Sequence, residues 1–267
     1  MPVTVPDVQS YKSSGKPFAM LAAYDYPTAQ ALDEAGVPLL LVGDTLGIFV
    51  LGYATTLPVT IEDIIHHCRA VTRGVNNALV VADMPFGTYH ASLADGVRSA
   101  GRLIQEGGAQ AIKLEGPCFD LVGTLTASGI PVMGHLGLTP QSFNKFGGNK
   151  VQARTRSAVD ELVDAAQRLE AAGAFAIVLE AVPSEAARAV TASLGIPTIG
   201  IGAGTQCDGQ VLVSSEMLGL SGGHRPRYAK LYADLRTEIV TAARNFIDEV
   251  ASRSYPDREH SYEWAIK

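Results

Sequence analysis

Four acidic residues close four short apolar stretches of the chain. Asp44 ends PLLLVGD, Asp83 ends LVVAD, Glu115 ends AIKLE and Glu180 ends AIVLE. Clustered carboxylates repel by about 4 kcal/mol per pair at 4 Å and an effective dielectric constant of 20, so a cluster needs protons or cations. Carboxylates also act as general bases and hold hard divalent cations. For any one acid, capping of the following helix is an equally good explanation, but four such acids favour one charged site.

The stretch AIKLEG adds a positive charge to this pattern. Side chains two residues apart on a strand point to the same face, so Lys113 and Glu115 stand side by side while Ile112 and Leu114 face the other way. Lys113 supplies one positive charge, and a divalent metal would supply two more. An all-oxygen ligand set suits magnesium, or else manganese or calcium, better than zinc.

The elements that must position these residues are short strands alternating with helices. Three intervening segments, 61–74, 94–108 and 158–173, carry apolar residues at helical spacing. Strand-then-helix units predict a parallel sheet, and about eight of them fit a single (β/α)8 barrel, although a doubly wound open sheet gives nearly the same pattern. In a barrel, the carboxyl ends of all strands meet at one mouth, where this fold holds its catalytic groups. The predicted strands lie within residues 18–25, 38–44, 79–85, 111–116, 130–137, 176–182, 197–204 and 210–216.

Length and composition indicate one domain that acts on small molecules. The chain has 267 residues, of which 47% are hydrophobic, which is enough for one large core. A formal net charge of -6 argues against nucleic acid or an anionic membrane as partner, and leaves a small molecule or another copy of the chain. Three cysteines without paired or metal-ligand spacing argue against a disulfide framework or a zinc site. Together with the lack of a long apolar run or signal pattern, they predict a cytoplasmic protein.

We predict that the barrel takes up the whole chain, 1–267, with a C-terminal extension over about 222–267. The extension holds one long helical pattern from Tyr228 to Val250 and a polar tail, which are candidates for oligomer contacts or for disorder.

Three other motifs have simpler explanations. IGIGAG lacks the third glycine and the later acid of a dinucleotide fingerprint, so a tight turn after a strand is favoured. His66 and His67 are adjacent on a helical pattern, whereas a metal pair needs spacing such as i, i+4, so surface or packing roles are favoured. KFGGNK is either an ordinary turn or a mobile lid.

Nine segments, in order and over nearly the whole chain, look like those of the ketopantoate hydroxymethyltransferase family. They are MLAAYDYPTAQ, LVGDTLG, GYATTLPVT, VVADMPFGTY, EGGAQAIKLEG, IPVMGHLGLTPQS, GAFAIVLEAVP, PTIGIGAG and CDGQVLV. The resemblance implies a (β/α)8 barrel of the phosphoenolpyruvate/pyruvate superfamily type, a bound Mg²⁺ ion and methylenetetrahydrofolate as one-carbon donor. It also implies a role in pantothenate biosynthesis, with α-ketoisovalerate (3-methyl-2-oxobutanoate) as the acceptor, and a homo-oligomer, usually a decamer.

The resemblance also assigns roles to single residues. It implies that Asp44, Asp83 and Glu115 ligate the metal, and that Asp44, Thr45, Asp83 and Lys113 contact the substrate. Thr45 stands where serine is usual in the family and keeps the hydroxyl.

The implied catalytic base is Glu180, which would remove the proton from the carbon next to the ketone. His135 ends a predicted strand near the same pocket and is expected either to contact the substrate or folate or to make a structural hydrogen bond. Two other functions compete with this hypothesis: a related magnesium-dependent lyase or mutase acting on a pyruvate-like acid, and a barrel that has lost turnover and serves as a scaffold.

Overall fold

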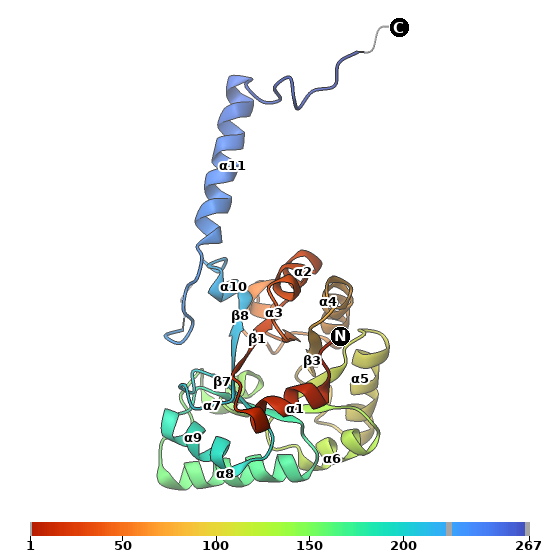
Figure 1. Ribbon diagram of the computed structural model, residues 1–267, viewed down its shortest axis with the longest axis vertical. Helices are drawn as coiled ribbons and strands as arrows, with labels where there is room; N and C mark the ends of the chain where they lie inside the picture. Colours follow the sequence, from red (N-terminus) through yellow and green to blue (C-terminus); the bar gives the residue numbers. More distant parts are fainter. Residues whose placement is uncertain (1, 223–225, 265–267) are drawn as a thin grey trace. The chain divides into compact units, whose positions relative to one another are not determined.

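A closed barrel of eight parallel strands forms the body of the protein, as the computed structural model shows for residues 2–222 and 226–264 (Figure 1). Each strand pairs with the next along the chain, and β8 pairs with β1, with Met20 opposite Val211. This last pairing closes the sheet and confirms the predicted barrel over the open alternative. The strands are β1 (Phe18–Ala22), β2 (Leu39–Val42), β3 (Leu79–Asp83), β4 (Ala111–Glu115), β5 (Val132–Gly137), β6 (Ala176–Glu180), β7 (Thr198–Ile201) and β8 (Gly209–Val213).

Helices follow most of the strands, and local side chains mark where several of them begin. Thr60 and Asp63 form a capping box at the start of α4, and Thr155 accepts a hydrogen bond from the Ala158 amide at the start of α8. The described helices are α1 (Val5–Ser14), α2 (Tyr26–Glu34), α3 (Leu46–Phe49), α4 (Ile61–Gly74), α5 (Leu93–Gln105), α6 (Phe119–Ala127), η1 (Pro140–Ser142), α7 (Phe143–Phe146), α8 (Arg156–Ala171), α9 (Ser184–Ser193), α10 (Ser214–Met217) and α11 (Leu235–Ser252).

The side chains of β4 point alternately to two different surroundings, as the alternation of residue types predicts. Ile112 and Leu114 are fully buried in the apolar core that the strands share with the surrounding helices. Lys113 and Glu115 point to the other face and line a cavity inside the barrel. Because strand side chains alternate, one short strand serves the core and the charged interior at the same time.

The chain divides into two compact units, Met1–Ser214 and Ser215–Lys267. The long helix of the second unit, α11, begins at Leu235, so the helical pattern predicted from Tyr228 starts too early. The amides of Tyr232 and Leu235 donate instead to the carbonyls of Met217 and Leu218, and Asp234 caps the helix. Hydrogen bonds to a segment distant in sequence therefore override the local helical pattern.

Two of the simpler motif explanations are confirmed. Gly202 and Gly204 of IGIGAG have positive φ values of 62° and 79° in the turn after β7. His67 lies on α4 and its Nδ1 is 2.6 Å from the carbonyl oxygen of Tyr24, which is a packing contact, while His66 is exposed.

Across the described residues, no helix has both the length and the apolar composition of a membrane span.

Candidate active site

The predicted site residues meet at the carboxyl ends of the strands. The strand register places Asp83 beside Lys113 and Glu115 beside His135, while Gly137 lies opposite Glu180. A cavity of about 50 Å³ lies at this mouth. Its polar lining is Asp44, Thr45, Asp83, Lys113, Glu115, His135 and Glu180. The fold therefore brings together every residue that the sequence nominated for chemistry.

Lys113 is the cation at the centre of this cluster. It is 3% exposed and forms an ion pair with Oδ1 of Asp83, whose Oδ2 accepts a hydrogen bond of 3.0 Å from the Asp44 amide. Burial lowers the pKa of Lys113, but the charges of Asp83, Glu115 and Asp44 raise it by more, so the net pKa is above its usual value. The lysine therefore stays protonated inside the barrel.

The carboxylates outnumber this one cation. Burial raises the pKa of Asp44 well above its usual value, and the charges of Asp83 and Glu115 raise it further, against smaller opposite effects of Lys113 and Gln141. Burial also raises the pKa of Asp83, and the ion pair with Lys113 offsets only part of that increase. An additional cation at this place would stabilise the ionised carboxylates.

The donor chemistry of the mouth fits a hard divalent cation such as Mg²⁺. Asp44, Asp83 and Glu115 offer carboxylate oxygens, which magnesium prefers, and the net negative charge of the cluster calls for a cation. Within residues 2–222 and 226–264, no three His, Cys, Asp or Glu side chains already form a ligand set. Asp83 pairs with Lys113 through Oδ1, so ligation through that oxygen requires it to change partner. Gln141 donates to Oδ2 of Asp44, so the other oxygen of this carboxylate can face a metal while the hydrogen bond is kept.

Glu180 and His135 form a second contact at the mouth. His135 Nε2 lies 3.2 Å from Glu180 Oε2, and its Nδ1 lies 3.5 Å from both Glu115 Oε1 and Lys113 Nζ. Burial and Lys113 lower the pKa of His135, but the hydrogen bonds to Glu115 and Glu180 outweigh them and raise it to about 9. The Glu180 side chain is 12% exposed, against 4% for Glu115, so it is the more accessible of these two acids.

Close packing and a hydrogen bond restrict the backbone around Glu180. Gly137 has a φ of 90°, and a Cβ atom there would lie 2.3 Å from the carbonyl oxygen of Glu180. That carbonyl accepts a hydrogen bond of 2.8 Å from the Leu138 amide. Ala181, directly after Glu180, has a positive φ of 47°, which costs an L-residue roughly 1–2 kcal/mol. Strained backbone of this kind is often found at functional sites.

Sequence reasoning missed the polar residues that hold the acids in place. Gln141 donates from Nε2 to Asp44 Oδ2, and Tyr89 donates from its hydroxyl to Gln141 Oε1. The hydroxyl oxygen of Tyr24 lies 2.7 Å from the hydroxyl oxygen of Thr45. The position of Gln141 in GLTPQS, just after a strand that ends at the mouth, was the signal in the sequence that could have nominated it.

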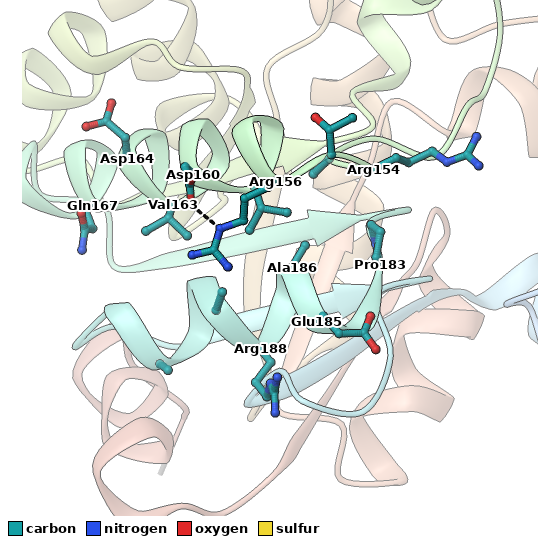
Figure 2. Close-up of a pocket in the computed structure, with 15 residues that line it drawn as sticks. Arg154, Arg156, Asp160, Val163, Asp164, Gln167, Pro183, Glu185, Ala186 and Arg188 are labelled. Carbon is teal, nitrogen blue, oxygen red and sulfur yellow. Dashed lines mark ion pairs between the residues drawn. The ribbon is translucent and has the colours of Figure 1, made fainter.

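A larger cavity, of about 930 Å³, lies between α8 and α9 on the outside of the barrel (Figure 2). None of the residues predicted to do chemistry lines it. Its arginines, Arg154, Arg156 and Arg188, do not converge on one point, and Arg156 pairs with Asp160 at 3.3 Å. This cavity carries charges of both signs without a buried polar group at its centre, so the small mouth cavity is the candidate active site.

The sequence matches a known protein family over nearly its whole length. The sequence model of the family "Ketopantoate hydroxymethyltransferase" matches residues 2–258. The chain is 51% identical over 262 residues to a 3-methyl-2-oxobutanoate hydroxymethyltransferase of Syntrophus aciditrophicus (strain SB), covering 97% of this chain and 96% of that protein.

Solved structures share the fold at low sequence identity. A 2,3-dimethylmalate lyase, described as a PEP mutase/isocitrate lyase superfamily member, matches with a TM-score of 0.58 and 17% identity, covering 98% of this chain and 93% of that one. A phosphonopyruvate hydrolase in complex with oxalate and Mg²⁺ matches with a TM-score of 0.61 and 15% identity, covering 97% and 93%. These likenesses show that the chain shares the barrel fold of these proteins.

Proposed function

Because the chain belongs to the ketopantoate hydroxymethyltransferase family, we propose that its barrel mouth performs hydroxymethyl transfer with Glu180 as base and with a divalent cation held by Asp44, Asp83 and Glu115. The family's reaction adds a hydroxymethyl group to 3-methyl-2-oxobutanoate and gives ketopantoate, a step of pantothenate biosynthesis. The observation that carries the proposal is the convergence of these acids with Lys113 in one mouth cavity.

The substrate carries a carboxylate and a neighbouring keto oxygen, which match the charges of the mouth. Lys113 is the buried cation that would pair with substrate oxygens, and Thr45, also in the cavity lining, would donate a hydrogen bond from its hydroxyl. A bound Mg²⁺ would supply Lewis-acid stabilisation of the negative charge that develops on the keto oxygen. Asp44 and Asp83 would then contact both the cation and the substrate.

Glu180 would take the proton from the carbon next to the ketone. The C–H bond breaks, its electron pair forms the enolate, and the enolate carbon then bonds to the one-carbon unit released from methylenetetrahydrofolate. One water enters in the overall reaction, and tetrahydrofolate leaves. His135, 3.2 Å from Glu180, would fix the orientation of the carboxylate, so a positioning contact is the role we propose for it.

The first test is the substitution Glu180→Gln, which keeps the size of the side chain but removes its ability to accept a proton. We expect turnover to fall by about 10²–10⁴-fold, the usual contribution of a general base. Exchange of the substrate proton with heavy water, measured without folate, should be catalysed by the wild-type protein and lost in the variant. Exchange at the wild-type rate would exclude Glu180 as the base.

Glu185→Gln provides the matched control for this test. Glu185 lies on α9, lines the outer cavity and is absent from the mouth lining. The same chemical change at this position should leave both turnover and proton exchange unchanged.

We also propose that the chain forms a homo-oligomer. The family resemblance implies a decamer. Helix α11 has no buried residue, and its large apolar side chains Ile239, Phe246 and Ile247 are more than half exposed. An exposed apolar stripe of this kind marks an interaction surface.

A further inference from the structure

Gln141 makes hydrogen bonds with every polar group of its side chain. It lies in η1, directly after β5 and its turn, and is 5% exposed. Nε2 donates to Asp44 Oδ2 and to the carbonyl oxygen of Met84, both at 2.9 Å, and Oε1 accepts from the Tyr89 hydroxyl at 2.8 Å. Both amide hydrogens and the acceptor are therefore used.

The directions of these hydrogen bonds determine which way the amide faces. The Glu115 amide donates to the Tyr89 hydroxyl oxygen at 3.2 Å. The hydroxyl hydrogen has Oε1 of Gln141 at 2.8 Å as its nearer acceptor, and the Glu115 carbonyl oxygen lies farther away at 3.4 Å. The Met84 carbonyl can only accept, so the amide nitrogen must face it and Asp44. A side chain with a donor and an acceptor at a fixed angle is needed here, and only glutamine and asparagine carry an amide.

The backbone of the same residue holds a second acid. The amide of Gln141 donates to Glu115 Oε2 at 2.9 Å. Asp44 follows β2 and Glu115 ends β4, so one residue from the loop after β5 holds two of the acids that come from other strands.

We propose that Gln141 is a positioning residue for the divalent cation, because it fixes the carboxylates of Asp44 and Glu115 in one arrangement. The inference rests on the metal assignment made above. Hydrogen-bonded partners of metal-ligating groups typically contribute 10–100-fold to metal affinity. Gln141 itself does not belong to the described cavity lining, so it acts through the acids and not on the substrate.

The test compares Mn²⁺ affinity, measured by titration calorimetry in the absence of substrate, between wild type and Gln141→Met. Methionine keeps the length and approximate volume of the side chain but makes none of its side-chain hydrogen bonds, while the backbone amide can still donate to Glu115. We expect the Kd for Mn²⁺ to rise about 10–100-fold, with turnover largely recovered at saturating Mg²⁺. A folded Gln141→Met protein that binds Mn²⁺ with wild-type affinity would overturn the proposal.

Gln110→Met is the matched control. The Gln110 side chain accepts a hydrogen bond of 2.8 Å from the Val80 amide, next to the amino end of β4, so the substitution also removes a side-chain hydrogen bond to the backbone. Mn²⁺ affinity should not change in this variant. An equal loss in both variants would point to a general effect on the fold and would contradict a specific role of Gln141.

Tyr89→Phe keeps the proposal testable if Gln141→Met does not fold. It removes the hydroxyl that donates to Oε1 of Gln141 and accepts from the Glu115 amide, while the side chain of Gln141 stays in place. A smaller rise in the Kd, of about threefold to tenfold, is expected, and an unchanged Kd would contradict the proposal. Asp83→Asn separates this inference from the metal assignment. If wild type binds no Mn²⁺, or if Asp83→Asn leaves the affinity unchanged, the assignment itself is wrong. If Asp83→Asn weakens binding and Gln141→Met does not, only the role of Gln141 is wrong.

Discussion

Asp33, far from the active site, should make one of the larger polar contributions to the stability of the barrel. It lies in the last turn of α2, is 6% exposed and holds the segment that leads into β3. Its Oδ1 accepts from the amides of Asn77 and Ala78 at 3.0 and 2.7 Å. Its Oδ2 accepts from the Asn76 amide at 3.0 Å and from the Asn77 side chain at 3.2 Å.

The substitution Asp33→Asn replaces one of these oxygens by an NH₂ group. Whichever way the new amide faces, two donors lose their acceptor, and the hydrogen bonds that remain lose the assistance of the charge. Each unsatisfied donor costs about 1–3 kcal/mol when buried, and Asn76 and Asn77 are exposed enough for water to replace part of the loss. We therefore expect a loss of about 3 kcal/mol, which corresponds to a fall in melting temperature of roughly 6–12 °C.

Thermal unfolding at pH 7, followed by circular dichroism, measures this difference. The control is Asp160→Asn on α8, where the side chain is 63% exposed and pairs with Arg156, so the change should be below about 0.5 kcal/mol. A fall of less than about 2 °C for Asp33→Asn would refute the reasoning, because the four hydrogen bonds would then contribute almost nothing.

The stability difference between wild type and Asp33→Asn should change with pH in a direction that the hydrogen bonds determine. Burial raises the pKa of Asp33, but the hydrogen bonds from Asn76, Ala78 and Asn77 lower it by more, so the folded-state pKa lies below the unfolded value of about 3.9. The stabilisation is therefore present above about pH 4 and is lost as the pH falls through the folded-state pKa. The difference in melting temperature between wild type and Asp33→Asn should shrink below pH 4, and a constant difference would contradict this linkage.

Two further predictions follow from the proposed function. Excess chelator should abolish turnover and added Mg²⁺ should restore it, while Asp83→Asn should weaken metal affinity without unfolding the protein; full activity in excess chelator would exclude the metal. In solution, light scattering should give a mass that is a multiple of five chains, and a monomer of 28.1 kDa would reject the assembly.

The sequence alone determined the strand and helix order and the chemical character of the mouth. Both depend on local patterns: the two-residue alternation of AIKLE separates Lys113 and Glu115 from the apolar core, and acids at strand ends must meet once the strands are parallel. The convergence of Asp44, Asp83, Glu115 and Glu180 was therefore predictable, and the structure confirms it. Their roles as ligands and base stay predictions.

Only the tertiary structure decided which neighbours those residues have. The pairing of Lys113 with Asp83, the place of His135 between Glu115 and Glu180 and the hold of Gln141 on two acids depend on strand register and on a loop whose path no local pattern encodes. The start of α11 at Leu235 has the same cause, since amides near it bond to a distant segment. Such contacts join residues remote in sequence, and their geometry exists only once the chain has closed around its core.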